Sequence, residues 1–172
     1  QGRVTRVDQL YRASSQRVIR DIGEGMAERG HVHGTRVLKV VQEKAGPEVA
    51  EALGLRKGAR VFHTVLVHLE NGVPIQYEDR YVNPQAAPGY LQTDFAQESP
   101  TLHLLRHAPL TEASYSIEAT LPTAEEAWAL DIALSEPCLV MMRRTVSGAH
   151  VASVARQLYP GKRYSFSGQF QA

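Results

Sequence analysis

The chain has 172 residues, of which 43% are hydrophobic, and a formal net charge of +1 at pH 7. This length suffices for one domain with its own core, and so small a charge excludes strong electrostatic attraction to nucleic acid or to an anionic membrane. No apolar run approaches the roughly 20 residues of a membrane span. The lone Cys138 excludes an intramolecular disulfide and favours a reducing cytoplasm.

The first part of the chain is polar. Residues 1–15 show neither helical nor strand periodicity, and the Gln1-Gly2 start resembles a tag remnant. We interpret residues 1–15 as a tag remnant with an interdomain linker, and residues 16–172 as one folded domain. The chain is therefore expected to be a fragment of a longer protein.

Short helices and strands alternate along the rest of the chain. Thr123 and Glu126 form a capping box, Gly30 and Gly54 stand where helices end, and Pro47 stands where one begins. Helices are predicted over residues 20–29, 47–53, 101–107 and 123–131, and strands over residues 35–41, the two halves of 61–84, 113–120, 138–146, 151–159 and 163–170. This order of elements predicts an α+β fold with a mainly antiparallel sheet.

The run from Val61 to Pro84 predicts a long β-hairpin, with Asn71-Gly72 between two β-rich segments. At least one face of these strands is expected to be buried, because Val, Leu, Ile and Tyr are frequent in them. Polar groups on such a face are costly unless something satisfies them, and a small polar ligand is one such partner. The polar residues concerned are His68, Gln76, Glu78, Asp79 and Arg80.

Motifs of enzymes and metal sites are scarce. The patterns GxGxxG, GxxxxGKS, GxSxG, HExxH and CxxC are all absent from the sequence. His103 and His107 stand four residues apart on a predicted helix, a spacing that can place two imidazoles on one metal, but no third ligand is recognisable. We predict no catalytic residue, no metal and no cofactor.

The adjacent Arg143 and Arg144 fall on one predicted strand. Neighbouring strand residues face opposite sides, so at most one of the two can point into a given cavity. The alternative is that both reach solvent or pair with carboxylates across the sheet.

Several short motifs follow one another in a fixed order. They are MAERGH at 26–31, TRVL at 35–38, VAEALGL at 49–55, NGVPI at 71–75, EDRYV at 78–82, SIEA at 116–119 and YPGKRY at 159–164. Together they resemble the effector-binding (UTRA) domain of GntR-type transcription repressors, over about residues 22–166. Within this family, residues 151–156 and 159–170 are most similar to repressors of histidine utilisation.

The resemblance implies a chorismate-lyase-like fold, in which a mainly antiparallel sheet has helices packed on one side. It also implies that the complete protein carries an N-terminal winged helix-turn-helix, and that operator DNA is bound only through that separate domain. For the histidine-utilisation branch, the implied effector is urocanate, the first product of histidine breakdown. The implied protein is a cytoplasmic regulator and not an enzyme.

The resemblance further implies where the effector binds. In relatives that bind phosphosugars, two basic residues on the first hairpin strand hold the phosphate, and a glutamate on the second holds sugar hydroxyls. Glu78 matches that glutamate, whereas Leu66 and His68 stand at the basic positions, which argues against a phosphosugar. The other positions that fall at the family pocket are Thr101, His103, Ser153 and Tyr159, with backbone N–H groups of the Gly34-Thr35-Arg36 turn facing the ligand.

Urocanate is a flat imidazole joined to a carboxylate. Its recognition needs a cationic or N–H-rich end, an acceptor such as Glu78 for a ring N–H, and flat walls. Candidate walls are Tyr77, Tyr81, Tyr115 and Tyr159, and candidate partners of the carboxylate are Arg36, Arg80 and Arg143. Two alternatives stay open: an enzyme of chorismate-lyase type, and a dimerisation module without a ligand.

The family pocket also requires a particular hairpin turn. A two-residue loop would put His68 and Glu78 on opposite faces. We therefore predict a three-residue loop with a left-handed Gly72, which pairs Leu66 with Gln76. The residues expected on one face are then Thr64, Leu66, His68, Gln76 and Glu78.

Apolar groups alternate along the predicted final strand, at Tyr164, Phe166, Gly168 and Phe170. So regular a stripe must be covered, either by the chain's own helices or by a second copy. Since repressors of this type bind two-fold operators, we predict a homodimer in which a second copy covers the stripe.

Overall fold

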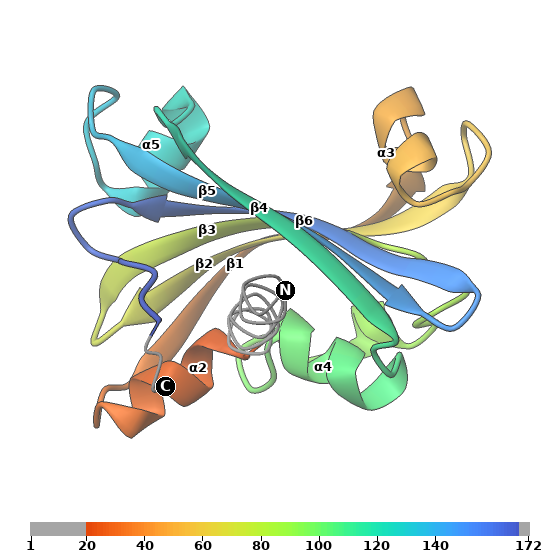
Figure 1. Ribbon diagram of the computed structural model, residues 1–172, viewed down its shortest axis with the longest axis horizontal. Coiled ribbons are helices and arrows are strands. Elements are labelled where there is room, and N and C mark those ends of the chain that lie inside the picture. Colours follow the sequence, from red (N-terminus) through yellow and green to blue (C-terminus); the bar gives the residue numbers. More distant parts are fainter. Residues whose placement is uncertain (1–19, 169–172) are drawn as a thin grey trace, which may run out of the picture.

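The computed structural model describes residues 20–168 (Figure 1). The elements are α2 (Ile22–Glu28), β1 (His33–Lys44), α3 (Pro47–Ala52), β2 (Arg60–Glu70), β3 (Val73–Val82), η1 (Tyr90–Gln92), α4 (Pro100–His107), β4 (Glu112–Thr120), α5 (Ala124–Leu130), β5 (Cys138–Ser147) and β6 (His150–Pro160). Every helix and strand predicted between residues 20 and 160 is present. The linker predicted at residues 1–15 lies outside the described residues.

The strands form a six-stranded sheet in the order β1-β2-β3-β6-β5-β4, and all neighbours are antiparallel. The sheet consists of two three-stranded meanders, whose last strands, β3 and β6, pair at its centre. The predicted fold class, α+β with a mainly antiparallel sheet, is confirmed.

The two faces of the sheet carry different helices. We call the face with Leu66, Glu78 and Gln157 the pocket face, because these three lie side by side on β2, β3 and β6. Figure 1 shows α2 and α4 on the same side of the sheet, with α3 and α5 on the other side near its two ends. The expectation that helices pack on one side therefore holds for α2, η1 and α4.

Separate apolar clusters explain this distribution. On the pocket face, η1 and α4 pack on β2 through a cluster that includes Phe62, Leu66, Tyr90 and Leu104. On the opposite face, one cluster joins Leu130 of α5 to β2, β3 and β6, and another joins Leu53, the residue that follows α3, to Val61. Each end of the opposite face thus has its own short helix to cover it.

Local sequence explains where the short helices begin. Asp21 caps α2 by accepting a hydrogen bond from the Gly23 N–H, and Ser99 caps α4 by accepting one from the Leu102 N–H. The capping box predicted at the start of α5 is present. Helices this short depend on such caps, because they have few internal hydrogen bonds.

The hairpin turn differs from its prediction. Asn71 and Gly72 alone connect the strands, with φ of 51° and 81°, as in a type I′ turn. The three-residue loop was wrong, although Gly72 is left-handed as expected. One extra residue, Ile75, bulges from β3 instead, so that His68 faces Gln76 and Leu66 faces Glu78. This bulge produces the shared face that was predicted for Thr64, Leu66, His68, Gln76 and Glu78.

The segment after β6 is not the predicted strand. Residues 163–168 are irregular, because β6 lies between β3 and β5 and offers no free edge to a further strand. Arg163 holds the segment by donating to the carbonyl oxygens of Pro74, Leu130 and Asp131. Tyr164 and Phe166 pack on Tyr159 of the same chain, so they do not offer the dimer surface that was predicted. Phe170 lies outside the described residues.

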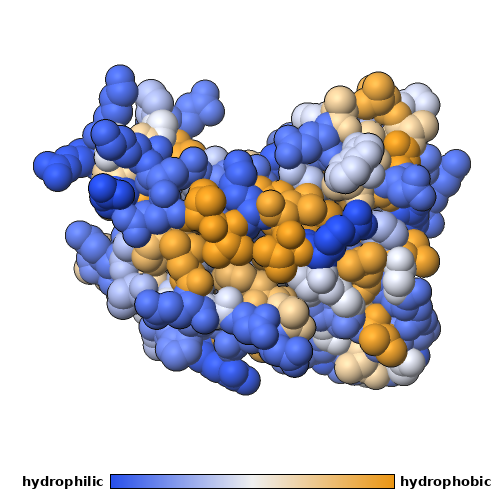
Figure 2. Space-filling model, turned by 180° about the vertical axis from the view of Figure 1, so that it is seen from behind, coloured by the Kyte–Doolittle hydropathy of each residue, from blue (hydrophilic) through white to orange (hydrophobic). Residues whose placement is uncertain are grey.

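Strand β1 is an exposed edge of the sheet. Its side chains Val37, Leu38, Val40 and Val41 are each 37% to 43% exposed. Figure 2, which views the molecule from behind, shows apolar side chains gathered across the middle of that face, with hydrophilic side chains around them. No helix within residues 20–168 is long and apolar enough to span a membrane.

Candidate functional site

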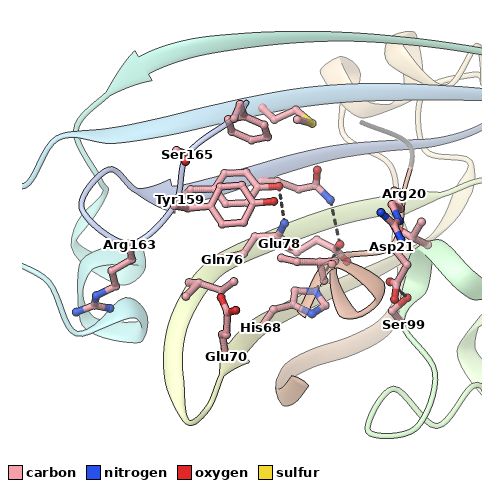
Figure 3. A pocket seen from close by; sticks show the side chains of 18 of the residues that line it. Arg20, Asp21, His68, Glu70, Gln76, Glu78, Ser99, Tyr159, Arg163 and Ser165 are labelled. Atoms are coloured by element: carbon pink, nitrogen blue, oxygen red, sulfur yellow. Dashed lines mark hydrogen bonds and ion pairs between the residues drawn. The ribbon is translucent and has the colours of Figure 1, made fainter. Parts of the chain in front are cut away.

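The pocket face forms the floor of a cavity of about 1200 Å³. Residues at the start of α2, at the start of α4 and in the segment 163–168 form its walls. In Figure 3, Gln76 and Glu78 of β3 and Tyr159 of β6 border the same space, with Asp21 and Ser99 at one end and Arg163 at the other. The floor consists of His68, Gln76, Glu78, Tyr115, Ile117, Met141, Arg143, Gln157 and Tyr159.

An ion pair lies at the centre of this floor. Glu78 and Arg80 share a face because they are two residues apart on β3, and they are 2% and 1% exposed. The guanidinium donates to both carboxylate oxygens, at 3.3 Å and 3.1 Å. Burial alone would raise the pKa of Glu78, but Arg80 and His68 outweigh burial and lower it. Glu78 is therefore ionised, and its charge is offset inside the protein.

Arg143 adds a second buried cation. Its Nη2 donates to the Thr101 hydroxyl at 3.0 Å, and Arg80 donates to the same oxygen at 3.4 Å. Burial, and then the neighbouring Arg80, lower the pKa of Arg143 to about 10, so it stays protonated at neutral pH. Two buried guanidinium groups therefore meet at the Thr101 hydroxyl beside the cavity floor.

Two imidazoles meet at the edge of the floor. His68 is 1% exposed, and its Nδ1 lies 2.9 Å from Nε2 of His33 on the neighbouring strand β1. The rings are stacked, with centroids 5.2 Å apart. Burial, and then His68, lower the pKa of His33. The other ring nitrogen of His68 lies 3.6 Å from Glu78 Oε1.

Two glutamines complete the polar floor. Gln157 donates through Nε2 to Glu78 Oε1 at 3.2 Å, and Gln76 donates through Nε2 to the Tyr159 hydroxyl at 2.6 Å. Their side-chain oxygens are buried and have no hydrogen-bond partner among residues 20–168. The floor therefore presents amide acceptors beside its cations.

Aromatic rings form the wall near the C-terminal segment. Tyr159 stacks on Tyr164 with ring centroids 4.4 Å apart, and Phe166 meets Tyr159 edge-on at 5.0 Å. Burial raises the pKa of Tyr159, so its hydroxyl stays protonated. This wall suits a flat ring, because offset and edge-on contacts between rings are favourable.

The opposite end of the cavity joins two helix caps. The Ser99 hydroxyl, which caps α4, donates to the carboxylate of Asp21, which caps α2. Both side chains are buried and line the cavity. The first turns of these two helices are thus held together at the cavity wall.

The structure brings six of the predicted site residues together at the cavity: His68, Glu78, Thr101, Tyr115, Arg143 and Tyr159. Arg80 and Ser153 lie on the same face of the sheet but are not among the lining residues, and they are hydrogen-bonded to each other at 3.2 Å. Thr35 and Arg36 are not among the lining residues, and the Arg36 guanidinium donates to the carbonyl oxygen of Ala129. His103 hydrogen-bonds to Thr93 instead of facing the cavity.

Several lining residues carry no motif that reveals them. Gln157 stands in an ordinary strand sequence, and only its pairing with Glu78 on the neighbouring β3 places it at the floor. Met141 then follows from its pairing with Gln157. Tyr164 and Phe166 were assigned to a dimer surface because their alternation resembles a strand. A signal for Gln157 was its even spacing from Ser153, which the sequence did place at the pocket.

The histidine pair of α4 belongs to no group of three potential metal ligands among the described residues. The rings of His103 and His107 lie 4.3 Å apart. Within residues 20–168, no group of three or more His, Cys, Asp or Glu side chains is arranged to hold a metal ion.

Residues 28–165 match the UTRA domain family. The chain is 46% identical over 152 residues to the histidine utilization repressor of Pseudomonas putida, covering 88% of this chain and 61% of that protein. It is 45% identical over 154 residues to the repressor of the same name from Pseudomonas aeruginosa, covering 90% and 62%. The chain thus spans about three fifths of the length of these relatives.

The fold also matches a solved structure. This is the C-terminal domain of the histidine utilization repressor from Pseudomonas syringae pv. tomato, with a TM-score of 0.79 and 45% identity. The match covers 82% of this chain and all of that domain.

Proposed function

This chain belongs to the UTRA domain family, and from that premise we propose that it is the effector-sensing domain of a cytoplasmic repressor of histidine utilization, with urocanate as its effector. The relatives named above support the regulatory part of this proposal. The chemistry of the cavity supports the choice of ligand.

The two guanidinium groups that meet at the Thr101 hydroxyl, one of them lining the cavity, are the observation that carries the choice of an acid. Arg143 is buried beside Arg80, and its lowered pKa reflects both burial and that repulsion. A ligand carboxylate beside Arg143 would relieve the repulsion, and charge-assisted hydrogen bonds of this kind are among the strong ones. Of the candidate arginines, Arg143 alone lines the main cavity.

The rest of the cavity suits a small flat ring. Tyr159, Tyr164 and Phe166 supply aromatic faces. Leu66, at a position where phosphosugar-binding relatives place a basic residue, is fully buried and apolar. A phosphosugar would therefore find no phosphate clamp on β2, which supports urocanate over that class of ligand.

Effector binding would act on DNA through parts of the repressor other than residues 20–168. Binding favours a conformation in which the linked DNA-binding domains no longer match the operator half-sites. The coupling between the two sites is typically about 1–3 kcal/mol. The proposed repressor is a homodimer, and the exposed apolar edge of β1 is the surface we assign to the second copy, because an uncovered strand edge invites pairing.

Two other functions fit less well. A chorismate-lyase-type enzyme shares the fold, but relatives above 40% identity are named repressors. A dimerisation module without a ligand would have its interior filled by side chains, whereas this chain has a cavity of about 1200 Å³.

Calorimetric titration of the purified chain with urocanate tests the proposal. We expect saturable binding to the native chain, and an affinity loss of about 1.5–3 kcal/mol in Arg143→Gln, the usual range for hydrogen bonds to charged groups. The matched control is Arg144→Gln on the next residue of β5. Glucosamine phosphate should bind poorly. Equal affinity for urocanate and the phosphosugar would overturn the assignment.

A further inference from the structure

Three buried polar atoms at the cavity floor have no hydrogen-bond partner within the described chain. They are Nε2 of His68, Oε1 of Gln76 and Oε1 of Gln157. Each side chain lines the cavity and is at most 3% exposed. Since an unsatisfied buried polar group is costly, three such atoms around one cavity indicate positions where a ligand supplies the missing partner.

The orientation of the Gln157 amide is fixed by charge. Its nitrogen faces the ionised carboxylate of Glu78 at 3.2 Å. The reverse orientation would place an amide oxygen against that carboxylate, and the two acceptors would repel. Gln157 therefore presents an acceptor to the ligand. Gln76 has no such constraint, because the Tyr159 hydroxyl can donate or accept.

The same reasoning assigns the proton of His68. Its Nε2 lies 3.6 Å from Glu78 Oε1, where a ring N–H is favoured over a lone pair. In the neutral ring, Nδ1 then accepts from Nε2 of His33 at 2.9 Å. His68 therefore presents a donor on one side of Glu78, while Gln157 presents an acceptor beside the same carboxylate.

Glu78 itself has little left to offer a ligand. One oxygen accepts from Arg80 and Gln157, and the other accepts from Arg80. We propose that Gln157 and His68 recognise the ring of the effector, with Gln157 accepting from the ring N–H and His68 donating to the other ring nitrogen. Glu78 acts through them as a positioning residue. This inference rests on the proposed function, and it names the ring chemistry that the site selects.

A donor and an acceptor side by side match one form of the ligand. A neutral imidazole has one N–H and one nitrogen lone pair. An imidazolium has two N–H groups, and its second N–H would point at the N–H of His68, so that two donors would face each other. The selected class is therefore a small planar acid with a neutral ring that carries both groups. A furan ring, which has no N–H, lacks the partner that Gln157 needs.

The experiment compares urocanate with furylacrylate, a planar acid of similar size that has a furan ring, by calorimetry. The native chain should prefer urocanate by roughly 5- to 30-fold, the factor for one or two kcal/mol. Gln157→Met has a similar shape without the amide acceptor. It should lose most of this preference, because urocanate binds more weakly while furylacrylate changes little. Gln85→Met, at an exposed loop residue, is the matched control and should keep it.

The outcomes separate this inference from the function on which it rests. If the native chain binds no urocanate, the proposed function fails. If the native chain binds urocanate but Gln157→Met weakens the binding of both acids equally, or of neither, Gln157 does not recognise the ring and the inference fails.

A comparison of ligands on the native chain does not depend on the folding of any variant. Urocanates methylated at either ring nitrogen have no ring N–H to donate to Gln157, and in one of the two the methyl group also covers the nitrogen that faces His68. Both should therefore bind the native chain at least about 5-fold more weakly than urocanate. Unchanged affinity for both methylated ligands would overturn the inference.

Discussion

At the scale of single residues, Glu78 shows how the sheet changes the role of a side chain. The family resemblance assigns it to the ligand, but its two oxygens accept from Arg80 and Gln157. The likeness could identify the residue because Glu78 stands in a motif. It could not identify these partners, because Gln157 reaches Glu78 only through the pairing of β3 with β6.

Glu78→Gln should therefore destabilise the fold. The change leaves Arg80 buried without a counter-charge, and breaking a buried pair in this way costs about 3–5 kcal/mol. Urea denaturation measures the loss. Glu112→Gln is the matched control, since its partner Arg144 lies 3.8 Å away and both side chains are exposed. That change should cost at most about 1 kcal/mol, and an equally small effect of Glu78→Gln would contradict the role given to the pair.

His33 gives the fold a dependence on pH. Burial, and then His68, lower its pKa from 6.5, so the unfolded chain binds a proton at a pH where the folded chain does not. The stabilising contribution is complete above pH 6.5 and is lost as the pH falls below it. Urea midpoints should therefore fall between about pH 7.5 and about pH 5.5, and His33→Asn should reduce that fall. The surface change His150→Asn is the control, and an identical pH slope in His33→Asn would contradict this account.

At the scale of elements, the caps of α2 and α4 form one unit, because the Ser99 hydroxyl bonds to both the Leu102 N–H and the Asp21 carboxylate. Ser99→Ala should cost about 0.5–2 kcal/mol of stability, as the loss of an N-cap does. It should also speed hydrogen exchange in α2, which loses support for its own cap.

Thr123→Ala removes the cap of α5 on the opposite face. Its effect on stability should be similar, but α2 should exchange at the native rate. Equal exchange of α2 in both variants would show that the two caps are independent.

The elements themselves were largely predictable from local signals. Caps, Pro47 and the Asn71-Gly72 turn mark boundaries within the sequence, and each operates within a few residues. The final segment was not predictable in the same way. Its alternation resembles a strand, but whether it pairs depends on a free sheet edge, and β6 has neighbours on both sides. The bulge at Ile75 likewise becomes visible only when the strands are paired.

At the scale of the whole molecule, the β1 edge carries four exposed apolar side chains close together in the sequence, Val37, Leu38, Val40 and Val41. Sedimentation at micromolar concentration should show a dimer. Leu38→Lys should shift it toward monomer, because a lysine on an edge strand opposes pairing. Leu38 lies in the irregular part of β1, outside the register with β2, so the change should leave the thermal midpoint nearly native. A native chain that sediments only as a monomer would contradict the dimer.

The proposed binding mode places urocanate over the sheet, with its acid at Arg143 and its ring at Gln157 and His68. A crystal structure of the chain grown with urocanate tests this placement. We expect the ligand in the cavity on the pocket face, its carboxylate within hydrogen-bonding distance of the Arg143 guanidinium and a ring nitrogen within reach of Gln157 Oε1. A ligand bound elsewhere, or one in the cavity with its carboxylate turned toward Gln157, would contradict the account.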